Sequence, residues 1–131
     1  MLMGAPTRAA KAETRGPVLV GDIDCDGHPD SISYTVAPKE VRVVVKFGQH
    51  DRADQSLTFP IDAYLQNGLC AAPAKVRLES LDFDPKTQDL GELHGFRRST
   101  TCKGVVLEDL QCDAIHIYWD HDARRLAYWR R

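Results

Sequence analysis

Hydrophobic and polar residues alternate along most of this chain with a period of two. Residues 31–36 are the clearest case, because Ile32, Tyr34 and Val36 alternate with polar neighbours, and residues 56–61 follow the same pattern. Such alternation indicates strands with one buried face and one solvated face. The pattern predicts strands at residues 17–21, 31–36, 41–47, 56–61, 75–83, 104–107, 113–119 and 124–130.

Helical periodicity is nearly absent. One short helix is predicted at 62–69, where Asp62 would cap the start and Gly68 the end. The last two strands flank the turn-like residues 120–123 and are expected to form a hairpin. We therefore expect a mainly β domain over residues 17–131, built as a single compact antiparallel sheet or as a sandwich or barrel, with at most one short helix.

Length and charge narrow the functional classes. The 131 residues suffice for one domain, and the net charge of -2 gives no global attraction to nucleic acid or to an anionic membrane. No apolar run approaches the roughly 20 residues of a transmembrane helix. The C-terminal RRLAYWRR could contact nucleic acid, act as a solvated edge strand, or recognise an acidic protein surface. The negative net charge disfavours nucleic acid.

The four cysteines are even in number and lack the CxxC spacing of a zinc ribbon, which favours two disulfides and an oxidising compartment. Closeness along the chain pairs Cys102 with Cys112 and leaves Cys25 with Cys70. Residues 1–16 are interpreted as a signal remnant or disordered tail, since Ala10-Lys11-Ala12 is typical of the end of a secretory signal. We expect a periplasmic or secreted protein; a cytosolic protein with reduced cysteines is the alternative.

The segment GDIDCDGHPD, residues 21–30, places carboxylates at alternate positions around one glycine. If Asp22 is position one, Gly27 takes the sharp turn at position six and the His28 carbonyl is available at position seven. Oxygen ligands at this spacing favour Ca²⁺, with side-chain ligands from Asp22, Asp24, Asp26 and Asp30 and a backbone ligand from His28. The segment is not an EF-hand, because position twelve is Ser33 instead of glutamate. A metal-free acidic turn is the alternative.

The stretch GDIDCDGHPDSISY resembles the strand-loop-strand calcium motif of FG-GAP and VCBS repeats, in which an aspartate at position nine replaces that glutamate. The resemblance implies the same five ligands. A single copy of the motif, where those families have many, argues against a propeller and for one ion that stabilises one domain.

The catalytic signals in the sequence are weak. The segment IHIYWDHD contains His116, Asp120, His121 and Asp122, but a strand followed by a turn does not bring them together. The chain has no GxSxG, phosphate-binding loop or HExxH motif. We therefore expect a protein that is not an enzyme; a secreted hydrolase would require convergent acids in a cleft.

The GDIDCDGHPD loop, the CKG and CD segments and the IHIYWDH and LAYWRR ending together resemble small periplasmic immunity proteins and lysozyme inhibitors. This resemblance implies a β-rich, calcium-binding domain that blocks a cell-wall-degrading effector by placing a protruding loop in its cleft. A calcium-dependent adhesion or carbohydrate-binding module is the alternative, and it should present exposed aromatic residues near the ion.

The segment TQDLGELHGFRRST, residues 87–100, is the best candidate for such a contact loop. It is polar and has two glycines, and His94, Arg97 and Arg98 could pair with catalytic acids of the partner. The alternative is an ordinary solvated connection.

Overall fold

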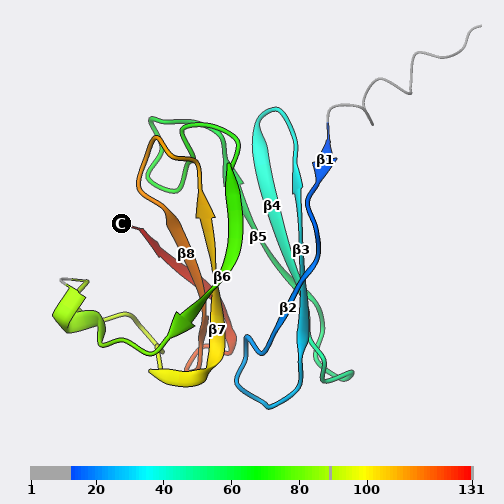
Figure 1. The fold of residues 1–131 in the computed structure, drawn as a ribbon, viewed down its shortest axis with the longest axis vertical. Helices are drawn as coiled ribbons and strands as arrows, with labels where there is room; N and C mark the ends of the chain where they lie inside the picture. Colours follow the sequence, from blue (N-terminus) through cyan, green and yellow to red (C-terminus); the bar gives the residue numbers. More distant parts are fainter. Residues whose placement is uncertain (1–12, 89, 131) are drawn as a thin grey trace, which may run out of the picture.

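A computed structural model of the chain describes residues 13–88 and 90–130. Within these residues the fold is mainly β, with two antiparallel sheets, one 3-10 helix and no α-helix (Figure 1). This arrangement confirms the predicted fold class. The strands are β1 (Thr14–Arg15), β2 (Leu19–Gly21), β3 (Asp30–Val36), β4 (Glu40–Lys46), β5 (Gln55–Pro60), β6 (Lys75–Leu81), β7 (Ser99–Glu108), β8 (Ile115–Asp120) and β9 (Arg125–Arg130), and the 3-10 helix is η1 (Pro85–Gln88).

The two sheets form separate layers with the hydrophobic core between them (Figure 1). One sheet has the order β1-β3-β4-β5, with β2 also pairing with β3, and the other has the order β6-β7-β8-β9. In β4, Val41, Val43 and Val45 are fully buried while Arg42 and Lys46 are exposed, as the alternation predicted. Each fully buried aliphatic side chain contributes about 1.5–3 kcal/mol to folding. The opposite sheet supplies Val105, Leu107, Ile115 and Ile117.

Hydrogen bonds join the sheets along both sides of the core. On one side the Lys103 amide of β7 donates to the carbonyl of Asp22, just after β2, at 2.9 Å. On the other side the Gln55 side chain of β5 accepts from the Leu126 amide at 2.9 Å and donates to the Arg124 carbonyl at 3.3 Å. The acidic loop that begins at Asp22 is therefore anchored to both layers.

The predicted helix at 62–69 is wrong. Residues 62–68 form successive turns, in which Leu65 donates to the Asp62 carbonyl and Gly68 to the Leu65 carbonyl. The Asp62 side chain does cap a turn, by accepting from the Tyr64 amide at 3.0 Å. Eight residues are too few to nucleate a stable helix alone, and the buried Leu69 draws the chain back to the Pro60 carbonyl.

The predicted disulfide pairing is also wrong, although both disulfides exist. Cys25 is bonded to Cys102 and Cys70 to Cys112. Closeness along the chain misled the prediction because β7 continues in regular pairing with β6 from Lys103 to Glu108. At about 3.3 Å per residue, its last six residues alone carry the chain roughly 20 Å away from Cys102. The two disulfides indicate an oxidising, extracytoplasmic environment.

The N-terminal segment pairs earlier than expected. Thr14 and Arg15 form β1 against Val36 and Thr35 of β3, although they fall within the predicted tail 1–16. Residues 1–12, including the expected signal remnant, lie outside the described residues. In the described part of the chain no helix is long and apolar enough to cross a membrane.

Candidate metal centre

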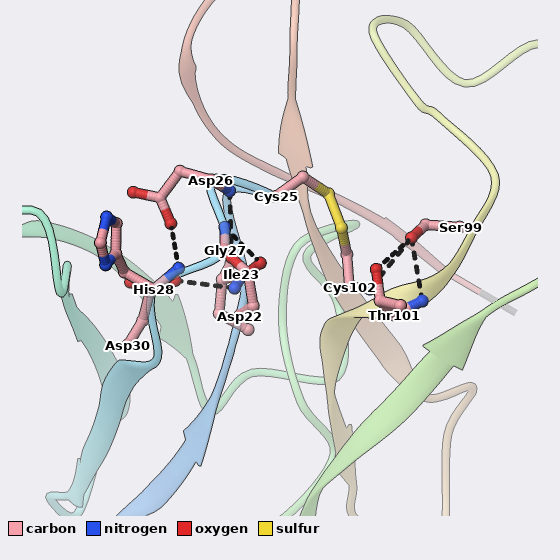
Figure 2. The surroundings of a disulfide bond; sticks show 10 residues. All are labelled: Asp22, Ile23, Cys25, Asp26, Gly27, His28, Asp30, Ser99, Thr101 and Cys102. Carbon is pink, nitrogen blue, oxygen red and sulfur yellow. Dashed lines mark hydrogen bonds between the residues drawn. A yellow bond between two sulfur atoms is a disulfide. The ribbon is translucent and has the colours of Figure 1, made fainter.

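The acidic loop, residues 22–30, connects β2 to β3 in a tight turn held by its own carboxylates. Gly27 has a φ of 86° and takes the sharp bend that the motif predicted. The Asp22 carboxylate accepts from the Gly27 amide at 2.9 Å and from the Asp26 amide at 3.3 Å (Figure 2). Asp26 in turn accepts from the His28 amide at 2.9 Å. These hydrogen bonds fix the conformation of the backbone that carries the carboxylates.

Asp30 closes the loop from the interior. Its side chain is fully buried and accepts from the Ile23 amide at 2.7 Å and from the Gly48 amide at 2.8 Å. One carboxylate thus joins the start of the loop to the segment that follows β4. Both oxygens of this buried carboxylate are thus engaged with backbone amides.

Three carboxylates converge inside this loop. Asp22, Asp24 and Asp30 each offer one oxygen, and the three oxygens lie within 4.8 Å of one another. Both oxygens of Asp24 and Oδ2 of Asp26 are buried and have no hydrogen-bond partner among the described residues. Buried carboxylate oxygens are normally paired with a donor or a metal. The cluster could therefore hold a metal ion, and the residues present fit one.

The protein's own charges do not neutralise the cluster. The Arg52 Nε lies 3.1 Å from Asp24 Oδ2, but neither atom has a well-directed hydrogen bond. Burial, followed by the negative charges of Asp30 and Asp26, raises the pKa of Asp24 to about 7 despite the opposing effect of Arg52. Burial also acts to raise the pKa of Asp26, but the His28 amide and other neighbours outweigh it and lower that pKa. A bound cation would remove the repulsion that raises the pKa of Asp24.

The four aspartates among the five predicted ligands fall into two groups. Asp22, Asp24 and Asp30 form the cluster, and Asp26 lies beside it with one buried oxygen that has no partner. The His28 carbonyl as a ligand remains a prediction. Sequence reasoning missed Arg52, which also lies 4.9 Å from the Trp119 ring centroid, because no local pattern links it to the acidic loop.

The expected partner-binding residues belong to the 82–98 loop, which connects β6 to β7 and projects from the four-stranded sheet (Figure 1). His94 is bonded to Asp120 at 2.7 Å and Arg98 to Asp82 at 2.8 Å, so both side chains are engaged within the chain. Arg97 is exposed and has no ion pair in the described part of the chain. Of the three residues, Arg97 is the one whose charge is available to a partner.

The base of the 82–98 loop is fixed to the sheet. The Tyr118 hydroxyl donates to the His94 carbonyl at 2.8 Å, and the His121 amide donates to the Gly95 carbonyl at 2.9 Å. The Phe96 ring packs on Tyr118 at a centroid distance of 5.9 Å. The loop therefore presents its tip from a rigid base.

The His94–Asp120 pair should make the stability of this base depend on pH. A hydrogen bond to Asp120 and that residue's charge raise the pKa of His94, and the Ala123 amide is the main cause of the lowered pKa of Asp120. Because the pKa of His94 is raised, its contribution to stability is complete below the ordinary pKa of 6.5 and is lost as the pH rises through the folded-state pKa. Because the pKa of Asp120 is lowered, its contribution to stability is present above the ordinary pKa of 3.8. The pair is therefore fully formed between these values.

We expect His94→Gln to destabilise the protein slightly at pH 5.5 and to have no effect near pH 8.5, in urea unfolding at both values. His50→Gln is the matched control, because His50 is also exposed but has no ion pair among the described residues. A destabilisation of equal size at both pH values would contradict the assigned charge pair. The effect should be small because the His94 side chain is 73% exposed.

The IHIYWDHD residues do not form one site. His116 pairs with Glu79 at 2.8 Å, whereas Asp120 pairs with His94. Asp122 lies close enough to Asp120 and His94 for a metal, but Asp120 and His94 are bonded to each other, and among these described residues no buried oxygen lacks a partner as the Asp24 oxygens do. In the C-terminal segment Arg130 donates to the carbonyls of Gln66, Gly68 and Asp113. The Arg130 side chain therefore connects loops, and Arg131 lies outside the described residues.

Two resemblances were expected from the sequence, one to calcium-binding repeats through the acidic loop and one to small periplasmic inhibitors through most of the chain. No protein-family model, characterised protein or solved structure matches this chain.

Proposed function

We propose that this chain is a periplasmic or secreted calcium-binding protein that inhibits a peptidoglycan-degrading, lysozyme-like effector by binding it. The observation that carries the proposal is the 82–98 loop, which projects from the sheet on a fixed base and carries the exposed Arg97. A preorganised loop loses little entropy when it enters a cleft. In this proposal the chain performs no reaction itself and binds neither nucleic acid nor membrane.

Calcium is the ion we assign to the acidic loop. All the candidate ligands are oxygens, which excludes the nitrogen and sulfur chemistry that zinc prefers. Calcium accepts six to eight oxygen ligands in a flexible geometry, whereas Mg²⁺ demands a near-ideal octahedron, so a loop that offers several carboxylates suits the larger ion better. Strands on both sides of the loop suit a structural ion better than a sensor.

Arg97 is the residue we assign to the partner's active site. Glycoside hydrolases that cleave peptidoglycan carry two catalytic carboxylates. An arginine can bond such a carboxylate through two parallel hydrogen bonds. His94 and Arg98 hold the loop in place through Asp120 and Asp82. The adhesion alternative gains no support, because the two rings that contact Arg52 beside the cluster, Phe47 and Trp119, are buried.

The test is inhibition of peptidoglycan hydrolysis. The chain should inhibit at least one of three lysozymes from different families acting on purified peptidoglycan in calcium buffer. Arg97→Ala should weaken that inhibition at least tenfold, because truncating one partner of a buried charge pair costs about 2 kcal/mol or more. Arg42→Ala, an exposed arginine on the outer face of the other sheet, is the matched control and should change nothing.

Lack of inhibition of all three hydrolases would contradict the proposed function. Inhibition that is unchanged by Arg97→Ala would place the interface elsewhere on the protein. The melting temperature of the Arg97→Ala variant must match that of the wild type, which shows that the loop substitution has not altered the fold.

A further inference from the structure

A pocket of about 310 Å³ lies between the 82–98 loop and the outer face of the four-stranded sheet. The sheet contributes residues from β6, β8 and β9, and the loop contributes three more. The lining residues are Glu79, His116, Trp129, Phe83, Gln88 and Leu90. None of them belongs to the metal cluster or is assigned to the partner interface, so the pocket is a separate feature.

The polar side of the pocket is fixed by one hydrogen bond. His116 Nδ1 donates to Glu79 Oε2 at 2.8 Å, and both side chains are largely buried. Glu79 reaches His116 across β7, where Gly104 lies opposite it. A side chain at Gly104 would meet the Ile117 carbonyl oxygen at 2.7 Å and Glu79 Cγ at 3.5 Å. The bond leaves Glu79 Oε1 and His116 Nε2 without hydrogen-bond partners among the described residues.

The apolar side of the pocket is aromatic, and contacts between its rings hold them in place. The Trp129 indole stacks on the His116 ring at a centroid distance of 3.7 Å and an interplanar angle of 3°. Phe83 meets Trp129 nearly edge to face at 6.2 Å and is backed by Phe96 at 5.0 Å. These contacts hold the pocket walls in place before any ligand arrives.

Apolar walls next to fixed hydrogen-bonding atoms match the surface of a sugar ring, which has C–H faces and a rim of hydroxyl groups. The volume lies at the small end for ligand pockets, about 300–1,000 Å³, and suits a single ring. A cation would need open aromatic faces and an uncommitted carboxylate. Here His116 covers one face of Trp129 and occupies one oxygen of Glu79.

We propose that this pocket binds one ring of a neutral saccharide, with Phe83, Leu90 and Trp129 against the ring and Glu79 and His116 bonded to its hydroxyls. This site does not require the proposed inhibitory function. It also differs from a calcium-mediated sugar site, because the metal cluster shares no residue with it.

The test is calorimetric titration of the whole chain, in calcium buffer, with glucose, galactose, mannose, N-acetylglucosamine and chitotriose. At least one sugar should bind with a millimolar or lower Kd, and Trp129→Ala and Glu79→Gln should each weaken it at least tenfold. Glu79→Gln preserves the side-chain shape and keeps the test valid if Trp129→Ala folds poorly. Arg77→Ala, on β6 and paired with Glu108 outside the pocket, should leave binding unchanged.

Any of three results would overturn the saccharide site. One is that none of the five sugars binds more tightly than glycerol. Another is that choline binds in the same pocket more tightly than every sugar, which would make it a cation site. Equal binding of a sugar by wild type, Trp129→Ala and Glu79→Gln would also overturn it, since the sugar would then be bound at another surface.

Discussion

Millimolar calcium should raise the melting temperature of the wild-type protein by about 10 °C above its value in EDTA. A ligand at a hundredfold excess over its Kd stabilises the folded state by about 2.7 kcal/mol, and each kcal/mol corresponds to roughly 3–5 °C for a domain of this size. Replacing Asp24 and Asp26 together with Asn should abolish the shift. Differential scanning calorimetry with and without calcium measures both effects.

The same variant should be at least as stable as the wild type in EDTA. Without an ion, the wild type keeps buried carboxylate oxygens that have no partner and repel one another. The control replaces Asp51 and Asp54, exposed carboxylates on the segment that carries Arg52, with Asn and should keep the full calcium shift. A wild type that melts at one temperature in EDTA and in calcium would rule out a structural calcium site.

Loss of the Cys25–Cys102 disulfide should cost about 4.5 kcal/mol on the chain-entropy model, and loss of Cys70–Cys112 about 4 kcal/mol, because the bonds close loops of 77 and 42 residues. Urea unfolding of the two double-serine variants measures these costs. The variants also differ in a second way. Cys25 lies inside the acidic loop, so its disulfide holds the metal site to β7, together with the hydrogen bond from the Lys103 amide to the Asp22 carbonyl.

The Cys25→Ser, Cys102→Ser variant should therefore bind calcium more weakly than the wild type, while the Cys70→Ser, Cys112→Ser variant should bind it normally. Each variant serves as the control for the other. An equal loss of calcium affinity in both would show that general destabilisation, and not the anchoring of the loop, controls the metal site. Non-reducing peptide mapping that joined Cys102 to Cys112 would contradict the pairing itself.

The strands could be predicted because every second residue of a strand faces the core. Ile32 and Val43 are fully buried in the pattern that the sequence implied, and the predicted hairpin forms between β8 and β9. The acidic loop could also be recognised from the sequence, since its four aspartates lie within nine residues. A local pattern can be recognised when the interactions that produce it are themselves local.

Contacts between distant segments could not be predicted in this way. The disulfide from Cys25 to Cys102 and the bond from Glu79 to His116 depend on which strands become neighbours. The pairing of His94 with Asp120 likewise required the 82–98 loop to fold back on β8. Residue types suggested that His94, Arg97 and Arg98 were equivalent, and only their tertiary partners distinguish them.

Direct calcium binding is the most decisive measurement. Protein stripped with EDTA and dialysed should bind one Ca²⁺ per chain in isothermal titration calorimetry, with a submillimolar Kd and weaker binding of Mg²⁺. The Asp24→Asn, Asp26→Asn variant should show no such binding. A wild type that takes up no more calcium than this variant would contradict the assignment of the acidic loop as a calcium site.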